Sequence, residues 1–194
     1  MKAICVFCGA NFNGDLTLKL AIEQLAEVMV SRDITLIFGG GKVGVMGLLS
    51  DTILATGGRA IGVMPRFLMD KEVGHTGLTE LHVVESMHQR KQLMSDLSDG
   101  FMMLPGGFGT LEEFFEVLTW LQLGLHQHPV GVLNINGFYD LLLQQMDVMV
   151  EQRFLKPTNR ELVLTSTDAI ELVNLMENCK VAPDEVWFRD RSLT

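Results

Sequence analysis

The sequence predicts an α/β protein with a single Rossmann-like, doubly wound and mostly parallel sheet, covered by helices on both faces. Short apolar runs alternate with longer segments of helical periodicity along the whole chain of 194 residues. The runs are apolar at successive positions, which is typical of strands buried on both faces of a parallel sheet. No linker rich in Pro, Gly or Ser and no internal repeat divides the chain. We therefore expect one domain at residues 1–179 and a C-terminal extension at residues 180–194.

Each expected strand is a short apolar run, and each expected helix is a longer segment with apolar residues at helical spacing. Strands are expected at residues 3–7, 35–38, 60–64, 81–84, 100–104, 130–134 and 162–165. Helices are expected at residues 16–29, 44–55, 86–97, 111–123, 138–152 and 169–178. Glycines follow the run at 35–38 and Pro65 follows the run at 60–64, so both strands stop at residues that interrupt strand structure. Residues 66–79 fit neither pattern and are assigned to no element.

The composition excludes several classes of partner. The chain has 15 Lys and Arg against 24 Asp and Glu, a formal net charge of −9, which disfavours a nucleic-acid polymer or an anionic membrane surface. No uncharged apolar run reaches the roughly 18 residues of a membrane span, and we expect no signal peptide. The three cysteines are an odd number, so we expect no disulfide framework and a cytoplasmic location.

No metal site is expected from the cysteines or histidines. Cys5 and Cys8 match C-x-x-C, but their odd spacing places the two side chains on opposite faces of the predicted first strand. We interpret both as core residues, because a structural zinc needs two further ligands nearby. His126 and His128 form an isolated H-x-H with no third ligand in view.

The first glycine-rich turn satisfies the dinucleotide fingerprint at Gly39, Gly41 and Gly44. The fingerprint belongs after the first strand, with an acidic residue about 20 positions later, whereas this turn follows the second strand and lacks that acid. An NAD-dependent oxidoreductase is therefore disfavoured. Two interpretations remain open, namely a tight turn between strand and helix, or a turn that contacts phosphate through Gly9, Gly40 and Gly41.

The second glycine-rich turn runs directly from a strand into a helix. Its glycines expose backbone donors and Thr110 adds a hydroxyl, which suits a phosphate at the start of a helix. The Lys-Ser/Thr ending of a Walker loop is missing, so hydrolysis of a magnesium nucleotide is not implied. Glu112 and Glu113 follow, and the spacing from Thr110 to Glu113 also fits a capping box. Capping and chemistry both remain open for Glu113.

The helix expected at 86–97 carries an arginine where its apolar stripe has a gap. Ser86 and Gln89 form a capping box at its start. The apolar positions then include Met87 and Met94, with Arg90 between them. An arginine on such a face either extends to solvent or binds a buried anion. Its place at the carboxyl end of a strand, close to the second glycine-rich turn, favours an anion site.

The segment from Met87 to Lys91, taken with the segment from Pro105 to Glu113, resembles the signature of the Lonely Guy family of cytokinin riboside 5′-monophosphate phosphoribohydrolases. The resemblance covers nearly the whole chain. It implies an enzyme that hydrolyses the N-glycosidic bond of a nucleoside 5′-monophosphate to a free base and ribose 5-phosphate. Members are sometimes labelled lysine decarboxylases, but no lysine here has a recognisable pyridoxal-phosphate context.

The resemblance also implies roles for individual residues. Arg90 and Glu113 are the implied catalytic pair. The residues implied to bind phosphate are Gly106, Gly107, Phe108, Gly109 and Thr110, and those implied to line the substrate site are Glu72, Lys91, Leu111, Glu112 and Thr119. The family usually has a serine after the first Cys-Gly, whereas Ala10 and Asn11 follow here. No metal or redox cofactor is required, and a homodimer is implied.

The residue types agree with this chemistry. Cleavage of a glycosidic bond builds oxocarbenium-like charge, which the carboxylate of Glu113 can stabilise while it orients or deprotonates water. The departing base gains negative charge, and the guanidinium of Arg90 can stabilise it. An AMP nucleosidase is the nearest alternative. A non-catalytic carrier of nucleotide or molybdenum cofactor is another, although a carrier has no need of both Arg90 and Glu113.

Overall fold

Seven parallel strands form one sheet in the computed structural model, which describes residues 1–72 and 74–179 but not the side chains of residues 70–72. Their order across the sheet is β4-β3-β2-β1-β5-β6-β7, and every pairing is parallel. The strands are β1 (Ala3–Phe7), β2 (Thr35–Phe38), β3 (Ala60–Pro65), β4 (Glu80–Val84), β5 (Phe101–Met103), β6 (Val130–Leu133) and β7 (Val163–Ser166). The predicted fold class and all seven predicted strands are confirmed.

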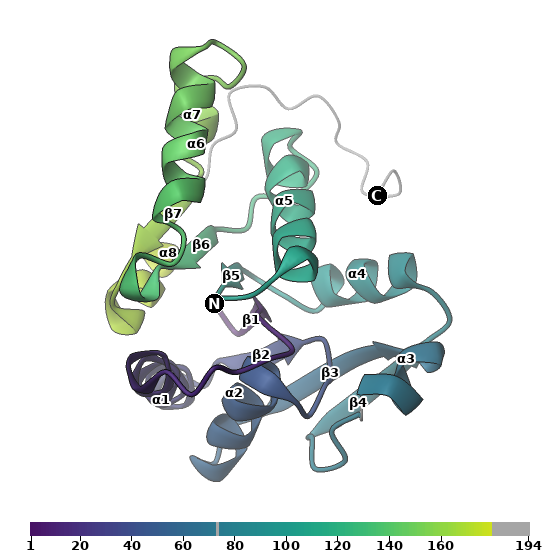
Figure 1. Ribbon diagram of the computed structural model, residues 1–194. Coiled ribbons are helices and arrows are strands. Elements are labelled where there is room, and N and C mark those ends of the chain that lie inside the picture. Colours follow the sequence, from purple (N-terminus) through teal and green to yellow (C-terminus); the bar gives the residue numbers. More distant parts are fainter. Residues whose placement is uncertain (73, 180–194) are drawn as a thin grey trace.

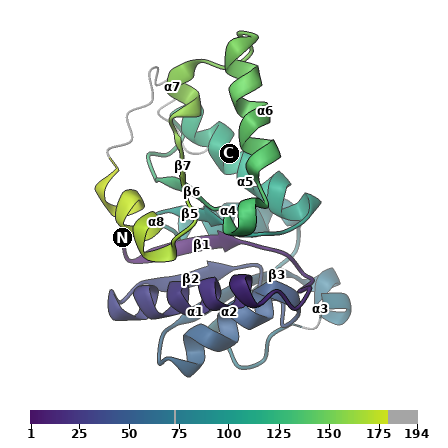
Figure 2. The ribbon, with the colours of Figure 1, turned by 60° about the vertical axis from the view of Figure 1, so that its left-hand side comes forward.

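Helices cover both faces of this sheet (Figures 1 and 2). They are α1 (Leu16–Ser31), α2 (Gly44–Ala55), α3 (Arg66–Glu72), α4 (Met87–Asp96), α5 (Phe108–Gln122), α6 (Asp140–Glu151), α7 (Pro157–Arg160) and α8 (Ala169–Asn178), with a 3₁₀ turn η1 (Ile135–Gly137). One core cluster packs α1, α2 and α8 against the sheet, and a second packs α4, α5 and α6 against the opposite face. The doubly wound arrangement is therefore also confirmed.

The first strand shows how the sequence produces two cores. All five residues of β1 are buried, and they alternate between the clusters. Cys5 belongs to the cluster that includes α5, while Cys8 belongs to the cluster that includes α1. The predicted separation of the two cysteines is confirmed, and both are free.

Three differences from the predicted elements concern helices. Residues 66–72 form α3, in the segment assigned to no element, and the four-residue helix α7 is too short to show a period. Helix α5 begins at Phe108, three residues before the predicted start at Leu111. Gly107 and Gly109, on either side of Phe108, have low helix propensity, so the sequence pattern did not indicate the first turn. Among the described helices, none is long and apolar enough to cross a membrane.

The strand order reverses between β1 and β5, and this point fixes where a ligand can bind. The chain continues from β1 towards β2 on one side, while β5 lies on the other side. Crevices at the carboxyl ends of such strands are the usual ligand sites of doubly wound sheets. The turns after the two strands touch here, since the Gly9 N–H donates to the Pro105 carbonyl at 3.1 Å.

Candidate active site

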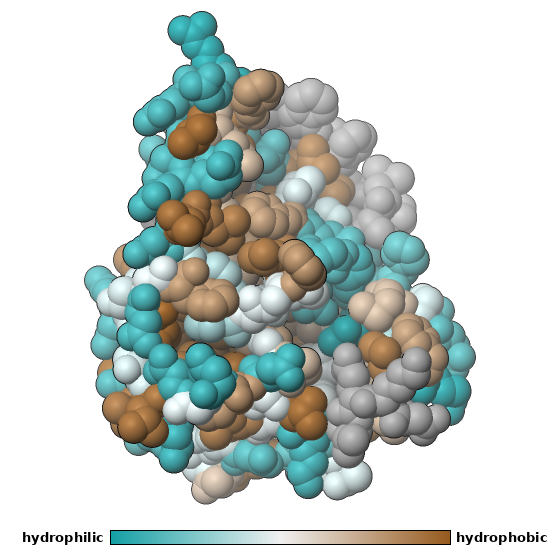
Figure 3. Space-filling view, in the orientation of Figure 1, coloured by the Kyte–Doolittle hydropathy of each residue, from teal (hydrophilic) through white to brown (hydrophobic). Residues whose placement is uncertain are grey.

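A cavity of about 550 Å³ lies at this crevice. Its walls come from the turn after β1, the N-terminal ends of α1, α2 and α5, one side chain of α4 and the loop after β6. Two exposed apolar side chains, Phe12 and Phe138, line it. Figure 3 shows apolar side chains gathered over the beginning of α5 and of α6. The lining of the cavity therefore combines polar side chains, such as Asn11 and Arg90, with apolar ones, such as Met46 and Phe138.

The N-terminal end of α5 forms the floor of the cavity. The N-cap is Gly107, which has no side chain to satisfy the first amides of the helix. These amides have no partners within the helix and carry its positive partial charge, so they favour an anion. A Cβ atom at Gly107 or Gly109 would meet nothing within 4 Å, so the space in front of both residues is open. Gly106, Gly107, Gly109 and Thr110 all line the cavity.

The turn before α5 is held from behind by a buried tyrosine. The Tyr139 hydroxyl donates a hydrogen bond to the Leu104 carbonyl at 2.8 Å, one residue before Pro105. Burial raises the pKa of the Tyr139 phenol, so the group stays protonated and keeps donating. The Tyr139 N–H in turn donates to the Asn134 side chain at 2.8 Å. The loop after β6 thus supports the glycine-rich turn.

The position of Glu113 rules out the capping interpretation. With Gly107 as the N-cap, Thr110 is the third residue of α5 and Glu113 the sixth, beyond the first turn. The capping box expected from Thr110 to Glu113 is therefore wrong. The capping of α4 is confirmed, because the Ser86 hydroxyl accepts the Gln89 N–H at 3.2 Å.

Arg90 and Glu113 face each other inside the cavity. The Nη1 atom of Arg90 lies 3.5 Å from Oε1 of Glu113, and their side chains are only 9% and 12% exposed. The Nε–H of Arg90 donates to the Val63 carbonyl of β3 at 3.2 Å. Arg90 is therefore buried and does not extend to solvent. Burial raises the pKa of Glu113, although the Arg90 guanidinium acts in the opposite direction.

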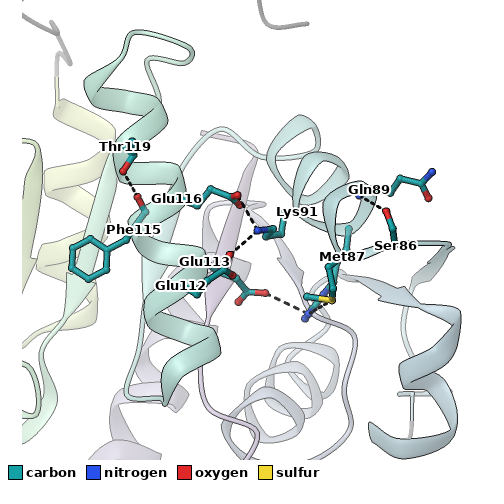
Figure 4. A network of polar contacts seen from close by, with 10 residues as sticks. Ser86, Met87, Gln89, Lys91, Glu112, Glu113, Phe115, Glu116 and Thr119 are labelled. Carbon is teal, nitrogen blue, oxygen red and sulfur yellow. Dashed lines mark hydrogen bonds and ion pairs between the residues drawn. The ribbon is translucent and has the colours of Figure 1, made fainter. Parts of the chain in front are cut away.

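Lys91 is held by two carboxylates at the edge of a groove between α4 and α5. Its Nζ atom lies 2.7 Å from Oε1 of Glu112 and 2.9 Å from Oε1 of Glu116. Figure 4 shows both contacts as dashed lines. These carboxylates help to raise the pKa of Lys91 against the opposing effect of burial. Sequence reasoning missed Glu116, although its spacing of four from Glu112 places both on one side of the helix. The groove is lined by Lys91, Glu116 and Trp120 among others, and not by Arg90 or Glu113.

Other predicted site residues lie outside the cavity. Phe108 is 93% exposed, Leu111 is half-buried, and the exposed Thr119 hydroxyl donates to the Phe115 carbonyl. None of the three lines the cavity, and neither do Lys91 and Glu112. The side chain of Glu72 lies outside the described residues, as does the predicted extension at 180–194.

The first glycine-rich turn packs against protein and not against the cavity. Gly9, in the turn after β1, does line the cavity, and its carbonyl accepts the N–H groups of Val45 and Met46 in the first turn of α2. Gly40 and Gly41 do not line it. Gly41 bridges to Gly74, so the tight-turn interpretation fits this segment better.

Two loops contribute lining residues that sequence reasoning missed. They follow β1 and β6, and the residues are Phe12, Asn13, Asp15, Ile135, Asn136 and Phe138. The loops are joined where the Asn136 amide donates to the Asp15 carboxylate at 2.9 Å. Their position after the carboxyl ends of two strands was the available signal. Within the described ranges, no group of three or more His, Cys, Asp or Glu residues could hold a metal ion.

Fold and site together define a class of protein. It is a Rossmann-like α/β protein with a cavity at the switch point, the place between β1 and β5 where the strand order reverses, and this cavity combines a helix N-terminus with a guanidinium that faces a carboxylate. A family model described as "Possible lysine decarboxylase" matches residues 46–176. The cytokinin riboside 5′-monophosphate phosphoribohydrolase LOG1 of Arabidopsis thaliana is 44% identical over 191 residues, which covers 96% of this chain and 90% of the relative. The probable phosphoribohydrolase LOGL1 of Oryza sativa is 42% identical, with 95% and 85% covered. The chain belongs to the Lonely Guy (LOG) family.

Solved structures of low sequence identity share the fold. A molybdenum cofactor binding protein from Rippkaea orientalis matches with a TM-score of 0.64 and 20% identity, covering 91% of this chain and 96% of that one. The molybdenum cofactor carrier protein of Chlamydomonas reinhardtii matches with a TM-score of 0.66 and 18% identity, covering 91% and 98%. At these identities the likeness concerns the fold alone.

Proposed function

We propose that this protein hydrolyses the N-glycosidic bond of a cytokinin riboside 5′-monophosphate and releases the free base and ribose 5-phosphate. The observation that carries the proposal is the buried pair of Arg90 and Glu113, 3.5 Å apart in the switch-point cavity beside the N-terminal end of α5. The names of the LOG relatives support the same reaction, since they are phosphoribohydrolases of cytokinin riboside 5′-monophosphates.

The 5′-phosphate binds at the start of α5. Its oxygens accept hydrogen bonds from the amides after Gly106, where the open space in front of Gly107 and Gly109 admits them. The Thr110 hydroxyl lies in the same wall of the cavity. Fixing the phosphate fixes the ribose against both catalytic groups, and this positioning lowers the entropic part of the barrier.

Bond cleavage divides the charge between the two catalytic groups. The bond from C1′ to the base nitrogen breaks, and its electron pair leaves with the base, which the Arg90 guanidinium stabilises. Positive charge develops on the ribose, and the Glu113 carboxylate stabilises it. Water adds to C1′ and gives a proton to Glu113, whose raised pKa makes it a better base. The departing base takes up a proton from solvent and leaves as the neutral free base, and Glu113 returns its proton to solvent and is ionised again. Cys8 also lines the cavity, but burial raises the pKa of its thiol and keeps it protonated.

The protein is further proposed to be a homodimer in the cytoplasm. The family resemblance supports the dimer, and so do the half-buried Phe115, Leu118 and Trp120 of α5. Phe114 contributes nothing to such a surface, because it is fully buried. The free cysteines support a reducing compartment. Light scattering after size-exclusion chromatography tests the dimer, and a mass of one chain, 21.6 kDa, would contradict it.

One assay tests the reaction. The purified protein is incubated with isopentenyladenosine 5′-monophosphate and, separately, with AMP, and free base and ribose 5-phosphate are both quantified. We expect both products in equal amounts, with the higher kcat/KM for the isopentenyl substrate. A higher kcat/KM for AMP would identify an AMP nucleosidase instead. Release of base from neither nucleotide would refute the hydrolase.

A further inference from the structure

Gly39 lies directly against the guanidinium of Arg90. It follows β2 and is the first glycine of the first glycine-rich turn, which matches the dinucleotide fingerprint at Gly39, Gly41 and Gly44. A Cβ atom at this position would overlap the Nη2 atom of Arg90, and it would lie 3.2 Å from Cζ and 3.4 Å from the Met46 sulfur. Real Cβ atoms essentially never approach another atom to less than 3.0 Å. The guanidinium can therefore occupy its site only while residue 39 has no side chain.

The other contacts of Arg90 show that the absence of a side chain at residue 39 also determines where the guanidinium lies. The Val63 carbonyl of β3 accepts a hydrogen bond from Nε. Nη1 lies 3.9 Å from the Met87 sulfur and 3.5 Å from the Glu113 carboxylate. Nη2 is the nitrogen that lies against Gly39. The guanidinium thus sits between strand ends of the sheet and the carboxylate of α5. A side chain at residue 39 would push it away from this arrangement.

The other glycines of the fingerprint have separate reasons of their own. Gly44 has a φ of +65°, and a Cβ atom there would overlap the backbone of Ala10. Gly41 bridges to Gly74. Each of the three glycines thus has a structural reason. Gly44 has a positive φ and lies close to the backbone of Ala10, Gly41 forms a bridge to Gly74, and Gly39 leaves space for Arg90.

We infer that Gly39 is a positioning residue of the active site, which acts through Arg90 and touches no substrate. The inference rests on the proposed function for its catalytic consequence, but not for the contact itself. A Cβ atom at residue 39 has to reach an ordinary separation of 3.4–4 Å, so the guanidinium must move by about 1 Å or more. A misplacement of that size is expected to lower kcat by about 100-fold.

A double-mutant cycle tests this inference with the full-length protein. The four proteins are the wild type, Gly39→Ala, Arg90→Ala and the double variant, each assayed for kcat and KM with isopentenyladenosine 5′-monophosphate and for thermal unfolding. We expect Gly39→Ala to lower kcat about 100-fold while KM changes by less than about threefold. The double variant should match Arg90→Ala, because the guanidinium that the methyl group displaces is already gone. Gly74→Ala is the control, since its Cβ atom would meet no atom closer than 3.6 Å.

Two results would overturn the inference. One is a wild-type kcat in Gly39→Ala, and the other is a double variant in which the two losses multiply. The unfolding measurements decide the question even if the wild type releases no base and the proposed function fails. Gly39→Ala should lower the melting temperature in the wild-type background but much less in the Arg90→Ala background, where the overlapping atoms are absent. An equal loss in both backgrounds would show that residue 39 does not act through Arg90.

Discussion

Replacing Glu113 with glutamine removes the charge of the carboxylate and keeps its shape. The Glu113 carboxylate already faces a full positive charge, that of Arg90, at 3.5 Å. An oxocarbenium ion at a similar distance would gain about 5 kcal/mol at an effective dielectric constant of about 20. Since each factor of ten in rate corresponds to about 1.4 kcal/mol, Glu113→Gln is expected to lower kcat by about three orders of magnitude. The proposed phosphate contacts at α5 are left in place, so KM should change little.

The same substitution has an opposite effect on stability. Burial raises the pKa of Glu113, so folding favours the protonated carboxyl group over the carboxylate. The stabilising contribution of this group is fully present below the pKa of the unfolded chain and is lost as the pH rises through the raised pKa of the folded state. Glutamine resembles the protonated form at every pH. We therefore expect Glu113→Gln to unfold at a higher temperature than the wild type at pH 7, with the difference disappearing in acid.

Two measurements check both expectations on the same preparations. Release of ribose 5-phosphate from isopentenyladenosine 5′-monophosphate gives kcat and KM, and thermal unfolding at pH 7 and at acidic pH gives the stability. A Glu113→Gln variant that keeps more than about a tenth of the wild-type kcat would refute the electrostatic role. A variant that is less stable than the wild type at pH 7 would refute the inferred cost of burying the carboxylate. The matching variant Glu116→Gln, which alters the partner of Lys91 outside the cavity, controls for loss of an acid from α5.

Three further predictions concern the same site. In the proposed mechanism the ionised form of Glu113 is the active one, so kcat/KM should rise with pH around a pKa above that of an ordinary glutamate. A kcat/KM that does not change with pH in the acidic range would contradict this. Gly106→Ala should destabilise the protein by about 1–3 kcal/mol, because its Cβ atom would overlap a neighbouring hydroxyl. Gly109→Ala should instead stabilise the protein by up to about 1 kcal/mol, because alanine has the higher helix propensity and its Cβ atom meets no other atom. Urea unfolding of both variants measures this, and a Gly109→Ala protein less stable than Gly106→Ala would contradict it. Tyr139→Phe should cost about 1–3 kcal/mol in the same assay by leaving the buried Leu104 carbonyl without its donor, and an unchanged midpoint would show that the bond is dispensable.

Most strands could be predicted from the sequence because they are buried on both faces, whereas the edge strand β4 has only exposed and half-buried residues. In β1, β3 and β6 every residue is buried, so the apolar run coincides with the strand. Helices were predicted less well where glycine replaced the apolar signal. Helix α5 begins at Phe108, but the two glycines beside that residue have low helix propensity, so the pattern became visible only at Leu111. The phosphate site predicted at the start of this helix stays a prediction, and its glycines Gly107 and Gly109 lie at the N-cap and in the first turn of α5.

Lining residues of the cavity could be predicted where a residue interrupted the expected pattern, as Arg90 does, or belonged to a glycine-rich or family motif, as Gly106 and Glu113 do. Arg90 interrupts an apolar face, and the structure shows that it is buried. Gly39 gave no comparable signal, because its role depends on a contact with a residue 51 positions later in the sequence, across two further strands. The loop residues Phe12 and Asn136 were missed for a similar reason. They reach the cavity through loop conformations, one of them with a φ of +54°, that no periodicity encodes.

The meeting of Arg90 and Glu113 follows from the topology of the sheet. In a parallel sheet, each helix that follows a strand begins near the carboxyl end of that strand. Arg90 is the fourth residue of α4 and Glu113 the sixth of α5, so they lie about 4.5 and 7.5 Å along their helix axes from the same end of the sheet. Both helices pack on the same face of the sheet and contribute to the same core cluster. Arg90 and Glu113, at similar distances from the ends of the strands, therefore lie side by side. Neither residue can move one position along its helix, because that step turns a side chain by about 100° and separates the guanidinium from the carboxylate.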